Sequence, residues 1–286
     1  MSRSSLWLYI WLHFRYRRFM TDREVYANAP VVLVACEVKF PTTATISPGQ
    51  LRRLKEALSS RFPLVKPVTR QTLTVSNGAP PEISEETVPR YTTRDRTSAV
   101  TIGAESLVVE TTKYGRYEDF RDAVESALAT VIDVNRPDGF ERVGLRYIDE
   151  IRTPNADGHA LGWATWIDGS AIGPAGLSEE LGFPVRDWQG LVRFDPAEDR
   201  TVVLRYGPRD GYAVDPRGSL RRPGKVPEPG PYFLLDIDSF WETSGDIPEF
   251  EGPALIALLD LLRAPVRSLF ESLITERLRE DVLRHA

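Results

Sequence analysis

The sequence predicts an α+β fold in which helices cover one face of a mostly antiparallel sheet. Strand-like segments follow one another closely along the chain, and direct succession favours antiparallel pairing. Two helical segments interrupt these strands and a long one closes the chain. The clearest strand, at 140–154, has an apolar and a charged side, which is typical of a sheet with only one covered face.

The clearest strand signal runs from Phe140 to Pro154 and reads FERVGLRYIDEIRTP. One side of it carries the apolar residues Val143, Leu145, Tyr147 and Ile151. The other side carries the charged residues Arg142, Arg146, Glu150 and Arg152. Asp149 breaks the alternation because it falls on the apolar side. Either a bulge shifts the register or this carboxylate is buried and needs a partner, and the bulge is favoured because a buried lone carboxylate is costly.

The first strand is predicted at Val31–Phe40, where the even positions, including Cys36, are apolar. A helix should follow from Ser47, which can cap it, with Pro48 at its first position and Gln50 completing a capping box. Pro63 should end this helix.

A meander of strands comes next. The predicted strands are Val65–Ser76, Arg90–Asp95, Ser98–Gly103 and Ser106–Lys113. The segment Asn77–Pro89 is rich in Pro and Glu and is interpreted as a loop. Apolar spacing from Tyr117 to Val131 then predicts an amphipathic helix that leads into the strand at 140–154.

The second part of the chain carries weaker signals. Asn155–Trp188 is expected to hold two short helices, and strands are predicted at Gly190–Phe194, Thr201–Tyr206 and Tyr232–Trp241. Asp215–Gly230 is interpreted as a mobile loop. A long helix should begin at Pro253, cover the sheet with residues such as Leu262, Phe270 and Leu273, and kink or split at Pro265.

These elements predict one α+β domain over residues 28–286, made of two sub-halves at 28–154 and 155–286. The halves are weakly similar, since GLRYID at Gly144 and VLRYGP at Val203 share LRY, a match that either chance or a structural repeat explains. Residues 1–27 are interpreted as an N-terminal extension. A mis-assigned start, with Met20 as the natural first residue, is favoured over an interfacial anchor because an anchor needs a longer amphipathic segment.

Composition restricts the compartment and the partners. The single cysteine excludes an intrachain disulfide, which fits a reducing cytoplasm. The apolar run Leu6–Phe14 is too short to span a bilayer, so no membrane partner is expected. The net charge of −5 argues against broad nucleic-acid binding. Phosphate contact through a basic loop stays open, although a solvated loop is favoured; its basic residues are Arg217, Arg221, Arg222 and Lys225.

Four stretches in a fixed order carry a family resemblance. They are NAP followed by EVKF near the start, GLRYID in the middle, LDIDSF at Leu235–Phe240 and FESLIT at Phe270–Thr275. With them the chain resembles a sporadically distributed family of uncharacterised bacterial proteins. Members often carry a histidine two turns before the Phe, where this chain has Arg263. The resemblance implies a cytoplasmic bacterial protein and implies no activity.

Asp236 and Asp238 are the best candidates for chemistry, because alternation places both on one face of a strand, about 7 Å apart. Such a pair can hold Mg²⁺ for phosphoryl or glycosyl transfer. The favoured alternative is that they form cross-strand ion pairs with Arg146 or Arg205. Asp157 and His159 could hold a metal, but a solvent-exposed loop is favoured there because a metal site usually needs three or four ligands. Neither a P-loop nor a nucleophile elbow occurs.

The side chains expected on the face away from the helices define a candidate binding face. They are Glu37, Lys39, Arg146, Arg152, Arg205, Asp236 and Asp238. The sequence therefore predicts a non-enzymatic binding or regulatory protein, with another protein as the expected partner and no cofactor. The sporadic distribution of the family that the chain resembles implies, in addition, a place in a mobile bacterial gene cassette. The alternative is a divalent-metal-dependent enzyme that acts on a phosphorylated or nucleotide substrate through Asp236 and Asp238. An ordinary solvated sheet face remains the simplest interpretation of the charges.

Overall fold

The computed structural model describes residues 24–42, 46–74, 82–154 and 160–285. Within them, nine strands form one sheet in the order β2-β3-β4-β5-β1-β6-β9-β8-β7, and every neighbouring pair is antiparallel. The strands are β1 (Val31–Lys39), β2 (Leu64–Thr74), β3 (Glu82–Thr92), β4 (Ser98–Ile102), β5 (Ser106–Thr111), β6 (Arg142–Ile151), β7 (Gly190–Ala197), β8 (Arg200–Arg209) and β9 (Tyr232–Glu242). The predicted α+β class with an antiparallel sheet is confirmed.

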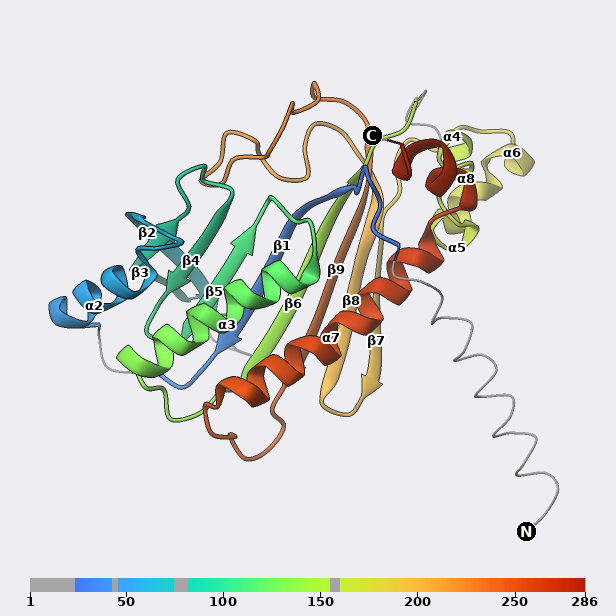
Figure 1. Cartoon of the computed structure of the whole chain (residues 1–286). Coiled ribbons are helices and arrows are strands. Elements are labelled where there is room, and N and C mark those ends of the chain that lie inside the picture. The colour runs from blue at the N-terminus through green and yellow to red at the C-terminus, as the bar shows by residue number, and fades with distance from the viewer. Residues whose placement is uncertain (1–23, 43–45, 75–81, 155–159, 286) are drawn as a thin grey trace, which may run out of the picture.

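The helices gather on one face of this sheet. They are α2 (Pro48–Leu58), α3 (Tyr117–Val134), α4 (Ala160–Ala164), α5 (Gly169–Ile172), η1 (Gly173–Leu177), α6 (Ser178–Leu181), α7 (Gly252–Leu273), α8 (Glu276–Leu278) and η2 (Arg279–Leu283). Figure 1 shows α3 and α7 lying across the same face, where α3 packs against β5, and α7 against β6 and β9. Four short helical segments lie between residues 160 and 181, where two short helices were expected.

Alternation along β1 explains why only one face is covered. Val32, Val34, Cys36 and Val38 are buried, and the residues between them are half-buried. Because successive side chains point to opposite faces, the buried set faces α3 and α7. The expectation that Cys36 is a core residue is confirmed, since only 1% of it is exposed.

The start of α2 follows the predicted capping box. The Ser47 side chain accepts a hydrogen bond from the backbone N–H of Gln50 at 3.3 Å, and the Gln50 side chain accepts from the N–H of Ser47 at 2.9 Å. Pro48 occupies the first helical position, where its missing N–H costs nothing. The helix ends at Leu58, before Pro63.

The loop expected at Asn77–Pro89 is wrong for residues 82–89, which belong to β3. This strand forms a long hairpin with β2, from Leu64 opposite Thr92 to Thr74 opposite Glu82. Pro89 does not break the pairing because its partner is Pro67 and because β4 pairs with β3 only at 90–92. Composition misled the prediction, since a proline is tolerated where its nitrogen meets no neighbouring strand.

The bulge favoured at Asp149 is also wrong for its own strand. The pairing of β6 with β9 is continuous from Arg142 to Ile151. The register shift lies instead in β1, between Val31 and Leu33, opposite Asp149. Asp149 therefore keeps its place on the helix-covered face and is only 5% exposed.

Pro265 does not split the last helix, because α7 continues through it to Leu273. Proline leaves the carbonyl four residues earlier without its partner. That residue, Leu261, is 45% exposed. Phe270 was expected to cover the sheet together with Leu262 and Leu273, but it is only partly buried and packs against the ring of Tyr26.

Leu262 is therefore the better test of how α7 stabilises the sheet. It is 1% exposed, and Leu262→Ala should lower the free energy of unfolding by about 2–5 kcal/mol through lost burial and a new cavity. The adjacent Leu261→Ala should change it by less than about 0.5 kcal/mol. Urea denaturation of both variants measures the difference, and equal losses would show that α7 does not bury this stripe.

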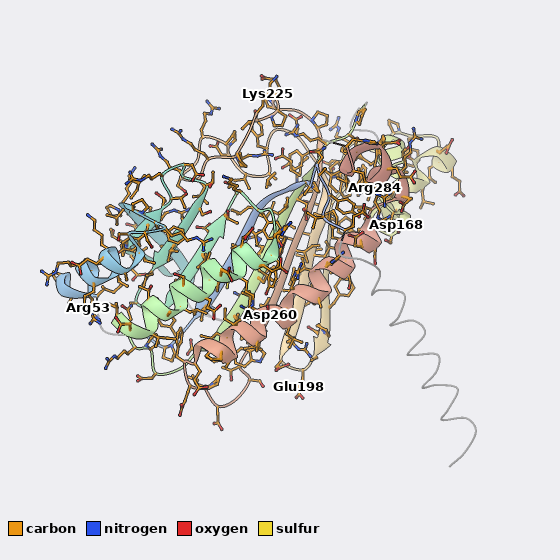
Figure 2. The ribbon with its side chains drawn as sticks, viewed as in Figure 1. Arg53, Asp168, Glu198, Lys225, Asp260 and Arg284 are labelled. Atoms are coloured by element: carbon orange, nitrogen blue, oxygen red, sulfur yellow. The ribbon has the colours of Figure 1, made fainter. Side chains whose placement is uncertain are left out.

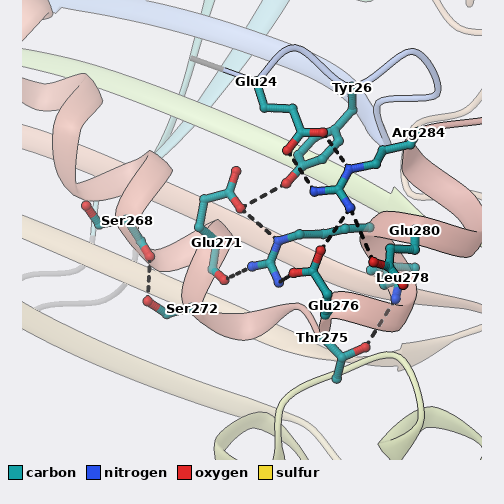
Figure 3. Close-up of polar contacts among 11 residues, drawn as sticks. Glu24, Tyr26, Ser268, Glu271, Ser272, Thr275, Glu276, Leu278, Glu280 and Arg284 are labelled. Carbon is teal, nitrogen blue, oxygen red and sulfur yellow. Dashed lines mark hydrogen bonds and ion pairs between the residues drawn. The ribbon is translucent and has the colours of Figure 1, made fainter. Parts of the chain in front are cut away.

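The segment before β1 contacts the end of the chain (Figure 3). The Tyr26 hydroxyl donates to Glu271 at 3.0 Å, and Arg284 pairs with Glu24 at 2.6 Å. Glu24 and Tyr26, which belong to the expected extension, therefore contact the helical layer. The proposed start at Met20 and His13 lie outside the described residues, as do Asp157 and His159.

Candidate functional site

The face of the sheet opposite α3 and α7 carries all seven residues predicted for the binding face. We call it the open face, and define it by the outward side chains of β1, β6, β9, β8 and β7. Glu37 and Lys39 project from β1, Arg146 from β6, Asp236 and Asp238 from β9, and Arg205 from β8. Arg152 follows β6 and contacts Glu150 on the same face. None of the described helices covers this face (Figure 1).

A bidentate contact on the open face joins Arg146 to Asp236. The Arg146 guanidinium donates through Nε and Nη2 to the two carboxylate oxygens, each at 2.7 Å. The pairing register places Asp236 between Ile148 on β6 and Arg205 on β8, and Arg205 approaches the carboxylate at 3.7 Å. The Asp236 side chain is only 6% exposed, so this bidentate pair satisfies a carboxylate that has little access to water. The hydrogen bond to Asp236 also raises the pKa of Arg146.

A second ion pair network lies beside the first and is centred on Arg142, which was not among the predicted site residues. Arg142 pairs with Glu37 at 2.8 Å and with Asp238 at 3.4 Å. Its guanidinium also lies 4.4 Å from the ring centroid of Phe240. Burial raises the pKa of Asp238, an effect that Arg142 partly offsets. Arg142 lies on the same side of its strand as Arg146, and this alternation could have added it to the predicted binding face.

These contacts bear on the metal hypothesis for Asp236 and Asp238. Both acids do share one face, as predicted, but Arg146 already binds both oxygens of Asp236 and Arg142 lies beside Asp238. Within the described ranges, no group of three or more His, Cys, Asp or Glu residues is placed to hold a metal ion. The arrangement matches the cross-strand ion pairs weighed against a metal site.

The loop between β8 and β9 is tied to one end of the open face. Buried Glu150 accepts hydrogen bonds from Arg222 at 2.9 and 3.0 Å and from the backbone N–H of Ala213 at 2.8 Å. Arg152 donates to the same carboxylate at 2.8 Å and to the carbonyl of Gly230 at 3.2 Å. The loop expected to be mobile is therefore anchored at both ends.

The basic residues of that loop have different surroundings. Arg222 is 12% exposed and paired, so the interpretation of a solvated basic loop is wrong for it. Arg217, Arg221 and Lys225 are exposed, and Figure 2 shows Lys225 projecting away from the sheet. Three cations on a loop remain available for a negatively charged partner.

The four stretches that carry the family resemblance lie together in the fold. EVKF covers the end of β1 and the residue after it, GLRYID lies in β6, LDIDSF lies in β9, and FESLIT covers the end of α7 and the two residues after it. The three strands are adjacent in the sheet, and α7 packs on two of them. Comparison with known protein families and with curated proteins finds no match to this sequence. Among the described residues, none of the helices combines the length and apolar character needed to cross a bilayer.

Proposed function

We propose that this protein is a non-enzymatic binding module that receives another protein on its open face. The observation that carries the proposal is the row of ion-paired charges held on a sheet face that none of the described helices covers. Arg146 keeps 45% of its side chain exposed and Arg205 keeps 44%, although both lie near the buried Asp236. A partner would therefore meet cationic groups whose positions are already fixed, which lowers the entropy lost on binding.

Apolar side chains between the charges support a protein as the partner. Leu33, Ile148 and Leu234 on this face are only half-buried, and Leu191 on β7 is 66% exposed. Arginine and apolar groups side by side are typical of the centres of protein interfaces. A nucleotide substrate is less favoured, because its phosphates would compete with Asp236 and Glu37 for the same arginines.

A cytoplasmic location and a place in a mobile bacterial gene cassette belong to this proposal. Their support is the family resemblance together with the single cysteine, which is buried and free. The neighbouring genes would name candidate partners directly.

The test compares capture by variants with opposite locations. Leu191→Asp combined with Arg205→Glu changes two paired, exposed positions of the open face. The matched control, Leu261→Asp, changes an exposed leucine on α7. Affinity capture from cells that naturally express the protein, followed by mass spectrometry, should identify a partner. In a binding assay, the purified partner should bind the wild type and the control but not the open-face variant.

The opposite outcome would overturn the proposal. If the partner is lost with Leu261→Asp and retained by the open-face variant, the helical side is the interface. Sedimentation of the purified chain distinguishes a second copy of the protein from a different partner, because only self-association depends on its own concentration.

A further inference from the structure

A pocket of about 500 Å³ lies on the other side of the sheet, among the segment before β1, β6, α3 and α7. Its volume falls within the range of about 300–1,000 Å³ that is typical of small-molecule sites. Asp149 and Tyr147 of β6 line it, with Tyr114 and Tyr117 around the start of α3 and Phe270 from α7. This site shares none of the ion pairs of the open face.

Asp149 is the feature that singles out this pocket. It is 5% exposed, and no hydrogen bond or ion pair joins its carboxyl to another residue in the part of the chain that the structure describes. A buried carboxyl without a partner is rare because it loses its hydration and gains nothing in return. A ligand that brings the missing partner into the pocket would remove this cost.

Aromatic rings surround the approach to Asp149. The rings of Tyr147 and Tyr114 meet edge to face with centroids 5.3 Å apart, and their hydroxyls hydrogen-bond each other at 3.0 Å. Phe270 also lines the pocket and packs against Tyr26, whose hydroxyl donates to Glu271 (Figure 3). Such walls suit an apolar body and are favourable neighbours for a cation.

Acidic and basic side chains both line the pocket, so the surroundings of Asp149 itself decide the sign of the ligand. The lining holds five acidic residues and the three arginines Arg116, Arg263 and Arg267, and Glu24 and Glu271 already pair with Arg284 and Arg279. The guanidinium of Arg263 lies over the ring of Tyr117 at 4.1 Å. Within the described ranges no arginine pairs with Asp149, which leaves its carboxyl for a ligand.

We propose that this pocket binds a small organic cation, in which a protonated amine pairs with the Asp149 carboxylate and an apolar or aromatic body packs between the tyrosines and Phe270. The inference does not depend on the function proposed for the open face.

Binding should be linked to proton release. Burial, with a smaller contribution from Asp236, raises the pKa of Asp149 to about 8, so the empty pocket holds a protonated acid near neutral pH. An amine favours the carboxylate and displaces that proton. Affinity for the amine should therefore rise with pH up to about 8 and level off above it.

Isothermal titration calorimetry with three matched probes tests the proposal. The probes are 2-phenylethylamine, the neutral 2-phenylethanol and the anionic 3-phenylpropionate. The wild-type chain should bind the amine about tenfold or more tightly than the alcohol, the gain expected from a charge-assisted bond to a buried group. Titration at pH 7 in buffers of different ionisation enthalpy should show release of a proton on amine binding.

Two variants complete the experiment. Asp149→Asn keeps the size of the side chain and should remove both the preference for the amine and the proton release, while alcohol binding stays unchanged. Asp119→Asn removes an exposed carboxylate of the same pocket and should retain both. Equal affinity for amine and alcohol, tighter binding of the acid, retention of the preference in Asp149→Asn, or no amine binding at millimolar concentration would each overturn the proposal.

Discussion

Replacing Glu150 by alanine should lower the free energy of unfolding by about 3–5 kcal/mol, since breaking a buried ion pair leaves charges without partners. The Glu150 side chain is fully buried and binds Arg222, Arg152 and the backbone N–H of Ala213. Without it, two arginines that are 12% and 22% exposed lose their carboxylate. Chemical denaturation measures the loss.

The same change should release the loop between β8 and β9, because Glu150 binds both Ala213 and Arg222 of that loop. Trypsin should then cleave at Arg217 or Arg221 much faster than in the wild-type protein, since both side chains are already exposed. Arg217→Ala, on the same loop, serves as the control and should leave stability unchanged within about 0.5 kcal/mol. Wild-type stability and protease resistance in Glu150→Ala would show that the loop is held by other contacts.

The second large effect is a pH-dependent stabilisation by Asp149→Asn. Burial raises the pKa of Asp149 from 3.8 to about 8. Between these values the folded state keeps a proton that the unfolded state has lost, so wild-type stability falls as pH rises. Each pH unit in this window costs about 1.4 kcal/mol from this group. Asparagine does not titrate, so the free energy of unfolding of the variant should increase relative to that of the wild type from about pH 4 to about pH 8.

Urea denaturation of both proteins at pH 5, 6, 7 and 8 measures this difference. Other titratable or charged groups near Asp149 include Tyr147 on its strand, Tyr114 before α3, Arg263 on α7 and, across the sheet, Asp236. They are present in both proteins, so their contributions cancel to first order. An advantage for asparagine that is the same at every pH would mean that Asp149 is ionised throughout.

Strands could be predicted where apolar and polar side chains alternate. They were missed where the prediction relied on amino-acid composition instead. The alternation in β1 and β6 correctly separated the core side from the charged side. Residues 82–89 were missed because Pro and Glu are unusual in strands, and only the hairpin with β2 explains their conformation. Counting along the strand placed Asp149 on the helix-covered face, which is correct. Its burial was then rejected in favour of a bulge in the same strand because a buried carboxylate is costly, but the register shift lies in β1.

The residues of the candidate site could be predicted from the sequence, but their contact partners could not. The seven residues of the predicted face, Asp236 and Asp238 among them, could be found by counting along strands. Their partners depend on which strands are neighbours, and Arg146 and Asp236 are 90 residues apart in the chain. The contact of Glu150 with Arg222 joins a strand to a loop 72 residues away, and no local sequence pattern predicts this contact.

The response of the melting temperature to Mn²⁺ or Mg²⁺ tests most directly whether the open face is an ion-paired binding surface or a metal centre. A cation at Asp236 would have to displace the two hydrogen bonds from Arg146, and at Asp238 it would meet Arg142. We therefore predict no change in the melting temperature of the wild-type protein at millimolar metal. A saturable rise that disappears in the double variant Asp236→Asn, Asp238→Asn would contradict this account, because it would show that the two carboxylates bind the metal in the folded state.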